Sequence, residues 1–264
     1  MDKDIIIQLI GILSVAFSGY KLKSLTKSGA ILTIIIGIAV AAGFGYQGLF
    51  LLGIFFVTSS LWSKYKSEKK ASIQQKVQKG EQRDYIQVLA NGGVPALAGI
   101  LHTLSPADIW LYLFIGAIAS ANADTWASEI GSLSKRNPLL ITSFKRVDRG
   151  TSGAISFLGS LSALAGSLLI IGAAFYFWND LSVFAIIVLA LTGFLGNWID
   201  TFLGAVIQVS YICEKCGFET EKSFHCNQKT RYYKGVTFCN NDFINVISIF
   251  FASMVGALFL SYFS

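Results

Sequence analysis

The sequence contains unusually few charged residues. Only 14% of its 264 residues are Asp, Glu, Lys or Arg, whereas 53% are hydrophobic. A soluble domain of this size normally has about 25% charged residues on and around its surface. The charges that are present fall in a few segments, between which lie apolar runs of helix length. This pattern excludes a large soluble core and indicates a protein embedded in a lipid bilayer.

The apolar runs predict an all-α fold, a polytopic membrane helix bundle of about eight transmembrane helices in a single domain, residues 1–264. They cover roughly residues 5–20, 29–45, 46–62, 85–104, 107–127, 152–178, 181–208 and 243–263. The second and third runs are short for a hydrocarbon core about 30 Å thick, so a re-entrant segment is an alternative there. No small-residue cleavage site follows the first run, which we therefore interpret as a retained helix.

Basic residues are nearly absent from one side of this topology. With the N-terminus outside, all but Lys3 of the 21 Lys and Arg residues fall in four loops on the other side. The positive-inside rule then predicts a cell-membrane protein with both termini extracytoplasmic. Two cytoplasmic loops stand out, a basic segment at 63–84 and a Cys/His loop at 210–240. Orientation and contact with anionic membrane lipids explain the net charge of +6, so no nucleic-acid partner is expected.

Carboxylates interrupt the apolar runs near their predicted cytoplasmic ends. They are Asp124, Glu129, Asp200 and Asp242. Charges within membrane spans are costly and usually functional. Each carboxylate here lies among Asn, Ser or Gln residues at helical spacing. We expect the four to converge at one depth as catalytic groups, with a buried hydrogen-bond network that fixes helix packing as the alternative.

A basic, glycine-rich segment opens the predicted sixth span. Its residues are Lys145, Arg146, Arg149, Gly150, Thr151, Ser152 and Gly153. Free backbone N–H groups at a helix N-terminus bind phosphate, so this segment is the candidate site for donor phosphates. An ordinary helix cap formed by Thr151 or Ser152 is the alternative. Carboxylates beside bound phosphate favour Mg²⁺, with Asp124, Asp200 and Asp242 as candidate ligands.

The cysteines all fall in one loop. Cys213 and Cys216 have the spacing of a zinc-binding pair, and His225-Cys226 follows nine residues after Cys216. Such soft ligands on one short loop predict a structural Zn²⁺ site in a zinc-knuckle-like loop. Adjacent His225 and Cys226 need a sharp turn to bind one ion together. Cys239 is therefore an alternative fourth ligand, and free cytosolic thiols are the alternative to zinc.

Several short motifs follow one another in order along nearly the whole chain. They are Gln87-Val-Leu-Ala-Asn91-Gly, Ala123-Asp124-Thr-Trp-Ala-Ser128-Glu129-Ile-Gly131, Gly150-Thr-Ser-Gly153, Asp200-x3-Gly204-Ala-x2-Gln208, Cys213-x2-Cys216, His225-Cys226 and Asn241-Asp242-x2-Asn245. As an ordered set they resemble the transmembrane protein 19 family, whose plant members include the phytyl-phosphate kinase of tocopherol synthesis.

The resemblance implies a membrane enzyme that converts an isoprenoid monophosphate to its diphosphate. The donor it implies is a nucleoside triphosphate, with CTP as the candidate. The site residues it implies are Asn91, Asp124, Ser128, Glu129, Thr151, Asp200, Gln208, Asp242 and Asn245. To these we add two residues from the polar faces of the predicted helices: Asn197, on the same face as Asp200, and Asn241, next to Asp242 at the start of the last helix. A transporter of a small or lipid-linked anion and a non-catalytic scaffold are the competing hypotheses.

Overall fold

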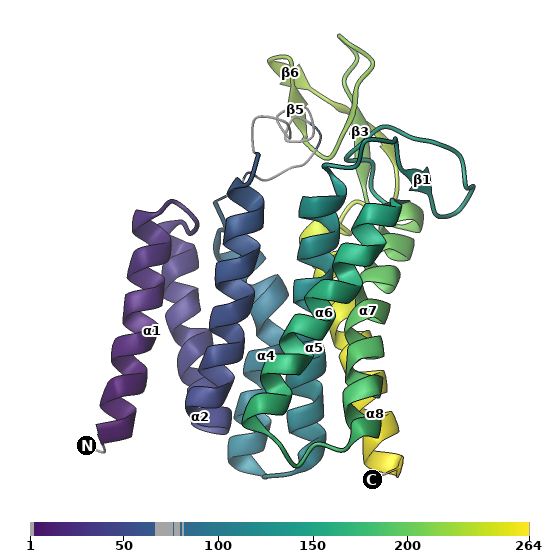
Figure 1. The fold of residues 1–264 in the computed structure, drawn as a ribbon. Coiled ribbons are helices and arrows are strands. Elements are labelled where there is room, and N and C mark those ends of the chain that lie inside the picture. The colour runs from purple at the N-terminus through teal and green to yellow at the C-terminus, as the bar shows by residue number, and fades with distance from the viewer. Residues whose placement is uncertain (1–2, 67–75, 77–79, 81, 264) are drawn as a thin grey trace.

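The computed structural model describes residues 3–66, 76, 80 and 82–263, so most of the basic segment 63–84 lies outside the described residues. The helices are α1 (Lys3–Lys21), α2 (Lys27–Lys64), α4 (Tyr85–Leu104), α5 (Asp108–Gly131), α6 (Phe157–Phe177), α7 (Val183–Val206) and α8 (Asn241–Phe263). They pack side by side in one bundle, with both termini at the same end (Figure 1). The predicted helical bundle is therefore present.

Helix α2 is folded back on itself at Gly45, which has positive φ (59°) and lies outside the helical region. A straight helix of 38 residues would be about 57 Å long. Instead, the Lys64 ammonium at its end donates to the Leu22 carbonyl oxygen, just before the helix begins, at 2.6 Å. Each arm is about 27 Å long, close to the thickness of a hydrocarbon core. Only a flexible residue such as glycine adopts this backbone conformation without strain.

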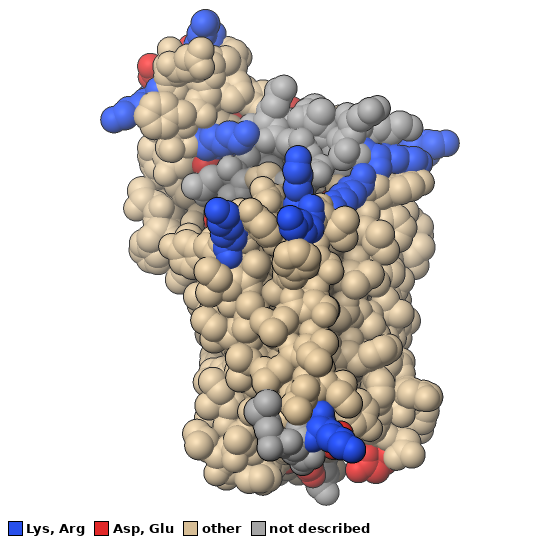
Figure 2. Space-filling model, turned by 90° about the vertical axis from the view of Figure 1, so that its left-hand side faces the viewer, with Lys and Arg blue, Asp and Glu red and all other residues tan. Residues whose placement is uncertain are grey.

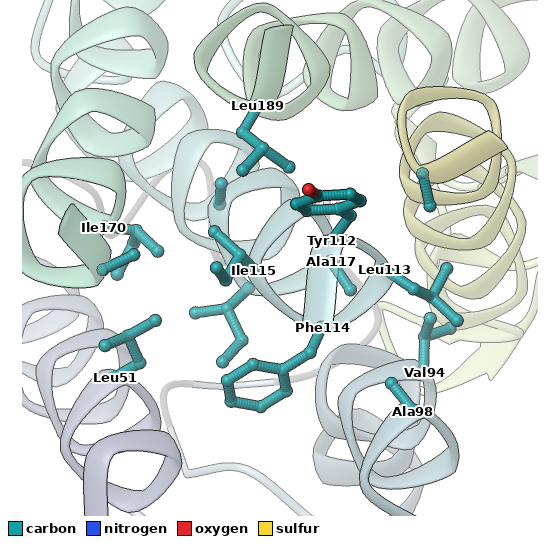
Figure 3. Packing of buried hydrophobic residues seen from close by; sticks show 14 of the residues in the cluster. Leu51, Val94, Ala98, Tyr112, Leu113, Phe114, Ile115, Ala117, Ile170 and Leu189 are labelled. Atoms are coloured by element: carbon teal, nitrogen blue, oxygen red, sulfur yellow. The ribbon is translucent and has the colours of Figure 1, made fainter. Parts of the chain in front are cut away.

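Helix α5 is the central helix of the bundle, and its residues 112–123 are all buried. A helix that is apolar on every side is stable only where protein or lipid surrounds it, and here protein does so. Figure 3 shows Phe114 and Ile115 surrounded by Leu51 of α2, Val94 and Ala98 of α4, Ile170 of α6 and Leu189 of α7. The core therefore surrounds the helix that carries Asp124.

Small residues bring α5 and α7 into close contact. A Cβ atom added to Gly193 would lie 2.8 Å from Cβ of Ala119, and one added to Gly196 would lie 2.7 Å from Cβ of Ser120. Close approach through small residues is a common way for membrane helices to associate, because lipid supplies little hydrophobic drive. One turn further along, this contact brings Asp124 opposite Asn197.

Short strands cover one end of the bundle, a feature that the all-α prediction did not include. They are β1 (Leu139–Leu140), β2 (Ala154–Ile155), β3 (Ser210–Ile212), β4 (Glu219–Thr220), β5 (Phe224–His225), β6 (Gln228–Lys229) and β7 (Arg231–Lys234). β1 pairs with β2, β5 pairs with β6, and β3 lies between β4 and β7, all antiparallel. On the face seen in Figure 2, Lys and Arg side chains gather at this end.

By length and composition, five of the described helices could cross a membrane: α1, α2, α6, α7 and α8. Much of their outer surface is apolar, with exposed Ile, Leu, Val and Phe side chains on all five helices. An apolar exterior of this extent is stable in lipid and would be costly in water.

Candidate active site

A polar cleft of about 210 Å³ lies at the strand-covered end of the bundle, between α5, α6, α7 and the segment that precedes α6. Its lining includes many of the residues predicted from the sequence. These are Asp124, Ser128, Arg149, Gly150, Thr151, Ser152, Gly153, Asn197, Asp200, Gln208 and Asn241. Residues that are far apart in the chain therefore meet in one small space.

Asp124 enters the cleft from the last turns of α5. The Asn197 side-chain amide donates to its Oδ1 atom at 3.0 Å. Asn197 is itself buried on α7, where the close contact with α5 holds its side chain in place. A charge-assisted hydrogen bond of this kind orients the carboxylate.

Asp200 faces the same cleft from α7 and is held by α8. The Ser248 hydroxyl donates to its Oδ2 atom at 3.2 Å. With its amide oriented to donate, Asn245 reaches the same oxygen at 2.8 Å. Asp200 also experiences electrostatic repulsion from Asp124 and from Glu221. The carboxylates of Asp124, Asp200 and Glu221 thus line one small cleft, an arrangement that favours a bound cation.

Arg149 and the Gly150–Gly153 turn form another wall of the cleft. The Arg149 Nη2 group donates to the Lys135 carbonyl oxygen at 3.1 Å, while its Nε atom is buried and has no hydrogen-bond partner among the described residues. Gly150 and Gly153 have positive φ, and Gly153 packs against Ala205 of α7. A guanidinium with a spare donor beside glycine backbone is suited to an anion such as phosphate.

The turn is not the start of a helix, which corrects the prediction for the sixth span. Strand β2 follows the turn, and α6 begins after Ser156, whose hydroxyl accepts from the Gly159 backbone N–H at 3.0 Å. The hydroxyl of Ser152 instead lies near the Gly204 carbonyl and donates to Gln208 Oε1 at 2.7 Å. Neither Thr151 nor Ser152 therefore caps the helix, and the first turn of α6, with Ser156 and Gly159, lines the cleft separately from the turn.

Two predicted residues face away from the cleft. Glu129 accepts from the Ser63 hydroxyl at 2.7 Å and interacts electrostatically with Arg83. Asn91 donates to the Gln87 carbonyl at 2.9 Å and lines a separate apolar cavity of about 780 Å³ between α1, α2 and α4. Five positions along a helix correspond to a rotation of about 140°, so Asp124 and Glu129 lie on different faces of α5. The expected convergence of four carboxylates is wrong for Glu129.

Four further candidates are also absent from the cleft lining, although one of them, Asn245, contacts Asp200. Asp242 is buried in the first turn of α8, but only its neighbour Asn241 lines the cleft. Lys145 and Arg146 are exposed, and Arg146 donates to the Asn137 carbonyl at 2.7 Å. Part of the chain between β1 and β2 extends away from the bundle (Figure 1), whereas its last residues, Arg149 to Gly153, line the cleft.

Glu221, which follows β4, also lines the cleft and was missed by the sequence interpretation. Its Oε1 atom accepts from Gln208 Nε2 at 2.7 Å, and Gln208 accepts in turn from Ser152. This chain of hydrogen bonds joins the Cys/His loop to the glycine-rich turn. No local pattern marks Glu221, because its partners lie on other parts of the chain.

The Cys/His loop brings together Cys213, Cys216, His225 and Cys226, whose ligand atoms lie within 4.8 Å of one another. The Sγ atoms of Cys216 and Cys226 are 3.8 Å apart. Tetrahedral zinc with Zn–S bonds of about 2.3 Å needs sulfurs about 3.8 Å apart, so the residues fit this metal. Cys226 and Asn227 have positive φ and form the tight turn of the β5–β6 hairpin. This turn allows His225 and Cys226 to face the same point.

Electrostatics also favour metal binding at this cluster. Burial disfavours the charged form of Cys213, but hydrogen bonds from His225 and from backbone N–H groups outweigh it and lower the pKa of Cys213 to about 6. A thiolate is the form that binds zinc. Cys239 is buried outside the cluster, and its backbone bonds to Val236 and Val209. Among the described residues, the candidate fourth ligand is therefore supplied by the His225-Cys226 turn.

The fold and the cleft define a helical integral membrane protein with an acidic polar site at one end of its bundle. The chain belongs to the family described as integral membrane protein DUF92, which matches residues 10–253. The resemblance to the transmembrane protein 19 family is thereby confirmed.

Known relatives cover most of the chain. Protein PGR of Arabidopsis thaliana is 34% identical over 92% of this chain and 92% of its own length. An uncharacterized membrane protein of Methanocaldococcus jannaschii is 30% identical over 90% of this chain and 87% of its own. The chloroplastic protein VTE6 of Arabidopsis thaliana is 28% identical over 89% of this chain and 65% of its own. No solved structure matches the chain.

Proposed function

We propose that this protein is a membrane-embedded phosphotransferase that converts an isoprenoid monophosphate, of the phytyl or polyprenyl type, to its diphosphate. The observation that carries the proposal is the cleft in which Asp124 and Asp200 face Arg149 and the glycine-rich turn. Phosphoryl transfer needs such positioning and charge neutralisation more than it needs a covalent catalyst. The resemblance to a family with a phytyl-phosphate kinase supplies the substrate class.

In the proposed reaction, an oxygen of the acceptor monophosphate attacks the γ-phosphorus of a nucleoside triphosphate, for which CTP is the candidate. The bond from that phosphorus to the bridging oxygen breaks, and nucleoside diphosphate leaves. No general base is required, because the acceptor phosphate is already anionic near neutral pH. Arg149 and the turn would hold the donor phosphates. Asn197 and Asn245 would hold the two carboxylates in place.

The carboxylates of Asp124, Asp200 and Glu221 offer the hard oxygen ligands that Mg²⁺ prefers, so the chemistry of the cleft fits this ion. When bound, such an ion neutralises phosphate charge during transfer. The Cys/His cluster is a second proposed metal site, for structural Zn²⁺. Its part in the enzyme would be to hold the loop that supplies Glu221.

The topology that suits this function has eight crossings, both termini extracytoplasmic and the cleft facing the cytoplasm. The fold-back of α2 at Gly45 supports two crossings by that helix. The basic residues at the strand-covered end support a cytoplasmic cleft. Nucleotides are cytoplasmic, while an isoprenoid chain would reach the site from the membrane lipids.

The test uses purified full-length protein in detergent with Mg²⁺, a labelled nucleoside triphosphate and a short isoprenoid monophosphate. We expect the diphosphate as product, and chelation of Mg²⁺ should stop its formation. Asp124→Asn and Asp200→Asn should each reduce turnover by roughly 10² or more, because each keeps size but removes a negative charge. The control is Asp108→Asn, an exposed residue at the other end of α5, which should retain turnover.

The competing hypothesis is a transporter of an anionic substrate, for which buried carboxylates within spans are equally good evidence. The cleft lies at one end of the bundle rather than at its middle, which favours the enzyme. Wild-type protein that transfers no phosphate with any nucleotide tried, but moves an anion across vesicle membranes, would support the transporter. Asp variants that retain wild-type turnover would show that the two carboxylates serve helix packing.

A further inference from the structure

Lys76 is buried, although it belongs to the basic segment 63–84, in which exposed side chains are expected. It is only 9% exposed, whereas Lys66, from the same segment, is exposed. Its Nζ atom lies 3.4 Å from the Thr151 hydroxyl oxygen and 3.6 Å from Oδ2 of Asp148. The ammonium is therefore directed at the glycine-rich turn. Together with Gly150, Ser152 and Glu221, Lys76 lines a small space that adjoins the cleft.

The backbone of Lys76 is anchored at the end of strand β4, next to Glu221. Its carbonyl oxygen accepts from the Thr220 hydroxyl and from the Glu221 backbone N–H, both at 2.8 Å. Its side chain lies over the Phe218 ring, with Nζ 5.4 Å from the ring centre. The two backbone hydrogen bonds fix the position of the residue without using the charge of its side chain.

The charge of Lys76 has weak partners among the described residues. Asp148 is 80% exposed, and an ion pair at 3.6 Å with so exposed a partner contributes little. The Thr151 contact, at 3.4 Å, is long for a hydrogen bond from an ammonium. Within the described part of the chain its other partner is the Phe218 ring, and a largely buried ammonium held this weakly is costly unless an anion completes its interactions. The nearby turn is the wall at which phosphate is proposed to bind.

We infer that Lys76 binds a phosphate of the donor triphosphate, together with Arg149 and the turn. The inference rests on the proposed function for the identity of the anion. The sequence suggested this role for Lys145 and Arg146. The inference gives it instead to Lys76, which reaches the site from a different loop. Lysine acts here as a point charge on a polyphosphate, as it does in other phosphate sites.

The test measures binding of tripolyphosphate, with Mg²⁺ present, to full-length protein in detergent by calorimetry. Lys76→Met keeps the apolar stem over Phe218 and the backbone anchors, so the loop should remain in place while affinity falls about tenfold or more. Lys76→Arg should restore most of the affinity. The matched control, Lys66→Met, should bind as wild type does. Wild-type affinity in Lys76→Met, or no binding by wild type, would overturn the inference.

A second measurement needs no variant. Bound tripolyphosphate should slow acetylation of Lys76 in wild-type protein but not that of Lys66, as followed by mass spectrometry. Equal rates with and without tripolyphosphate would overturn the inference. Loss of binding in Lys76→Met, with no transfer by wild type to an isoprenoid monophosphate, would leave Lys76 assigned and reject the proposed function. Equal rates of phosphate transfer by wild type and Lys76→Met would reject the role of Lys76 and support the proposed function.

Discussion

Gly193→Ala tests whether the contact between α5 and α7 sets the geometry of the cleft. The new Cβ would lie 2.8 Å from Cβ of Ala119, in a contact that also includes the Ser167 hydroxyl. Carbon atoms pack at about 3.5–4.0 Å, so the helices must separate by roughly 1 Å. Asn197, one turn along α7, would then move away from Asp124.

Two effects of different size are expected from this substitution. Overpacking of a tight interior costs about 1–3 kcal/mol of stability. Misplacement of a reacting group by about 1 Å can cost roughly 10²-fold in rate. The loss of phosphate transfer should therefore exceed what the loss of folded protein explains.

The assay compares turnover per folded molecule with thermal unfolding in detergent. Gly172→Ala is the matched control, because it also lies within a helix but its new Cβ would have no atom within 4 Å. That variant should be at least as stable as wild type, since alanine favours helix by about 1 kcal/mol over glycine. Equal turnover and stability for Gly193→Ala and Gly172→Ala would refute the argument from close packing.

Two further predictions concern the metal cluster and the topology. Purified protein should carry about one zinc ion per chain, which Cys216→Ser should lose and Cys239→Ser should keep, as measured by elemental analysis. Metal-free wild type that is fully folded would contradict this site. In intact cells, an impermeant thiol reagent should label cysteines introduced by Asp108→Cys and Asp180→Cys, but not one introduced by Arg146→Cys. The opposite labelling would reverse the orientation.

The local pattern was enough to predict the membrane class and most helices. Apolar runs predicted α1, α4, α5 and α8 to within a few residues, because the length of a buried helix follows directly from uninterrupted apolar sequence. Pairing of the runs 29–45 and 46–62 within α2 depends on the backbone of Gly45. The small strands escaped prediction because segments this short carry too little pattern to distinguish them from loops.

The cleft could be predicted only in part. Asp124 and Asp200 were identified because a charge within an apolar run is conspicuous by itself. The same reasoning selected Glu129, although it pairs with Ser63 on another face of α5. Spacing along a helix gives the angle between two side chains, but not which neighbouring helix each side chain meets.

The sequence alone determined that this protein is a helical membrane protein, with nearly all of its basic residues in the segments between apolar runs and its cysteines in one loop. Those properties depend on residue composition and on the spacing of apolar residues, both of which can be read from short stretches of the sequence. Tertiary structure decided that Glu221 and Lys76 join the glycine-rich turn and that His225 and Cys226 face one point. Contacts between distant segments depend on how helices pack and how the chain turns, and a single sequence does not encode these in any local pattern.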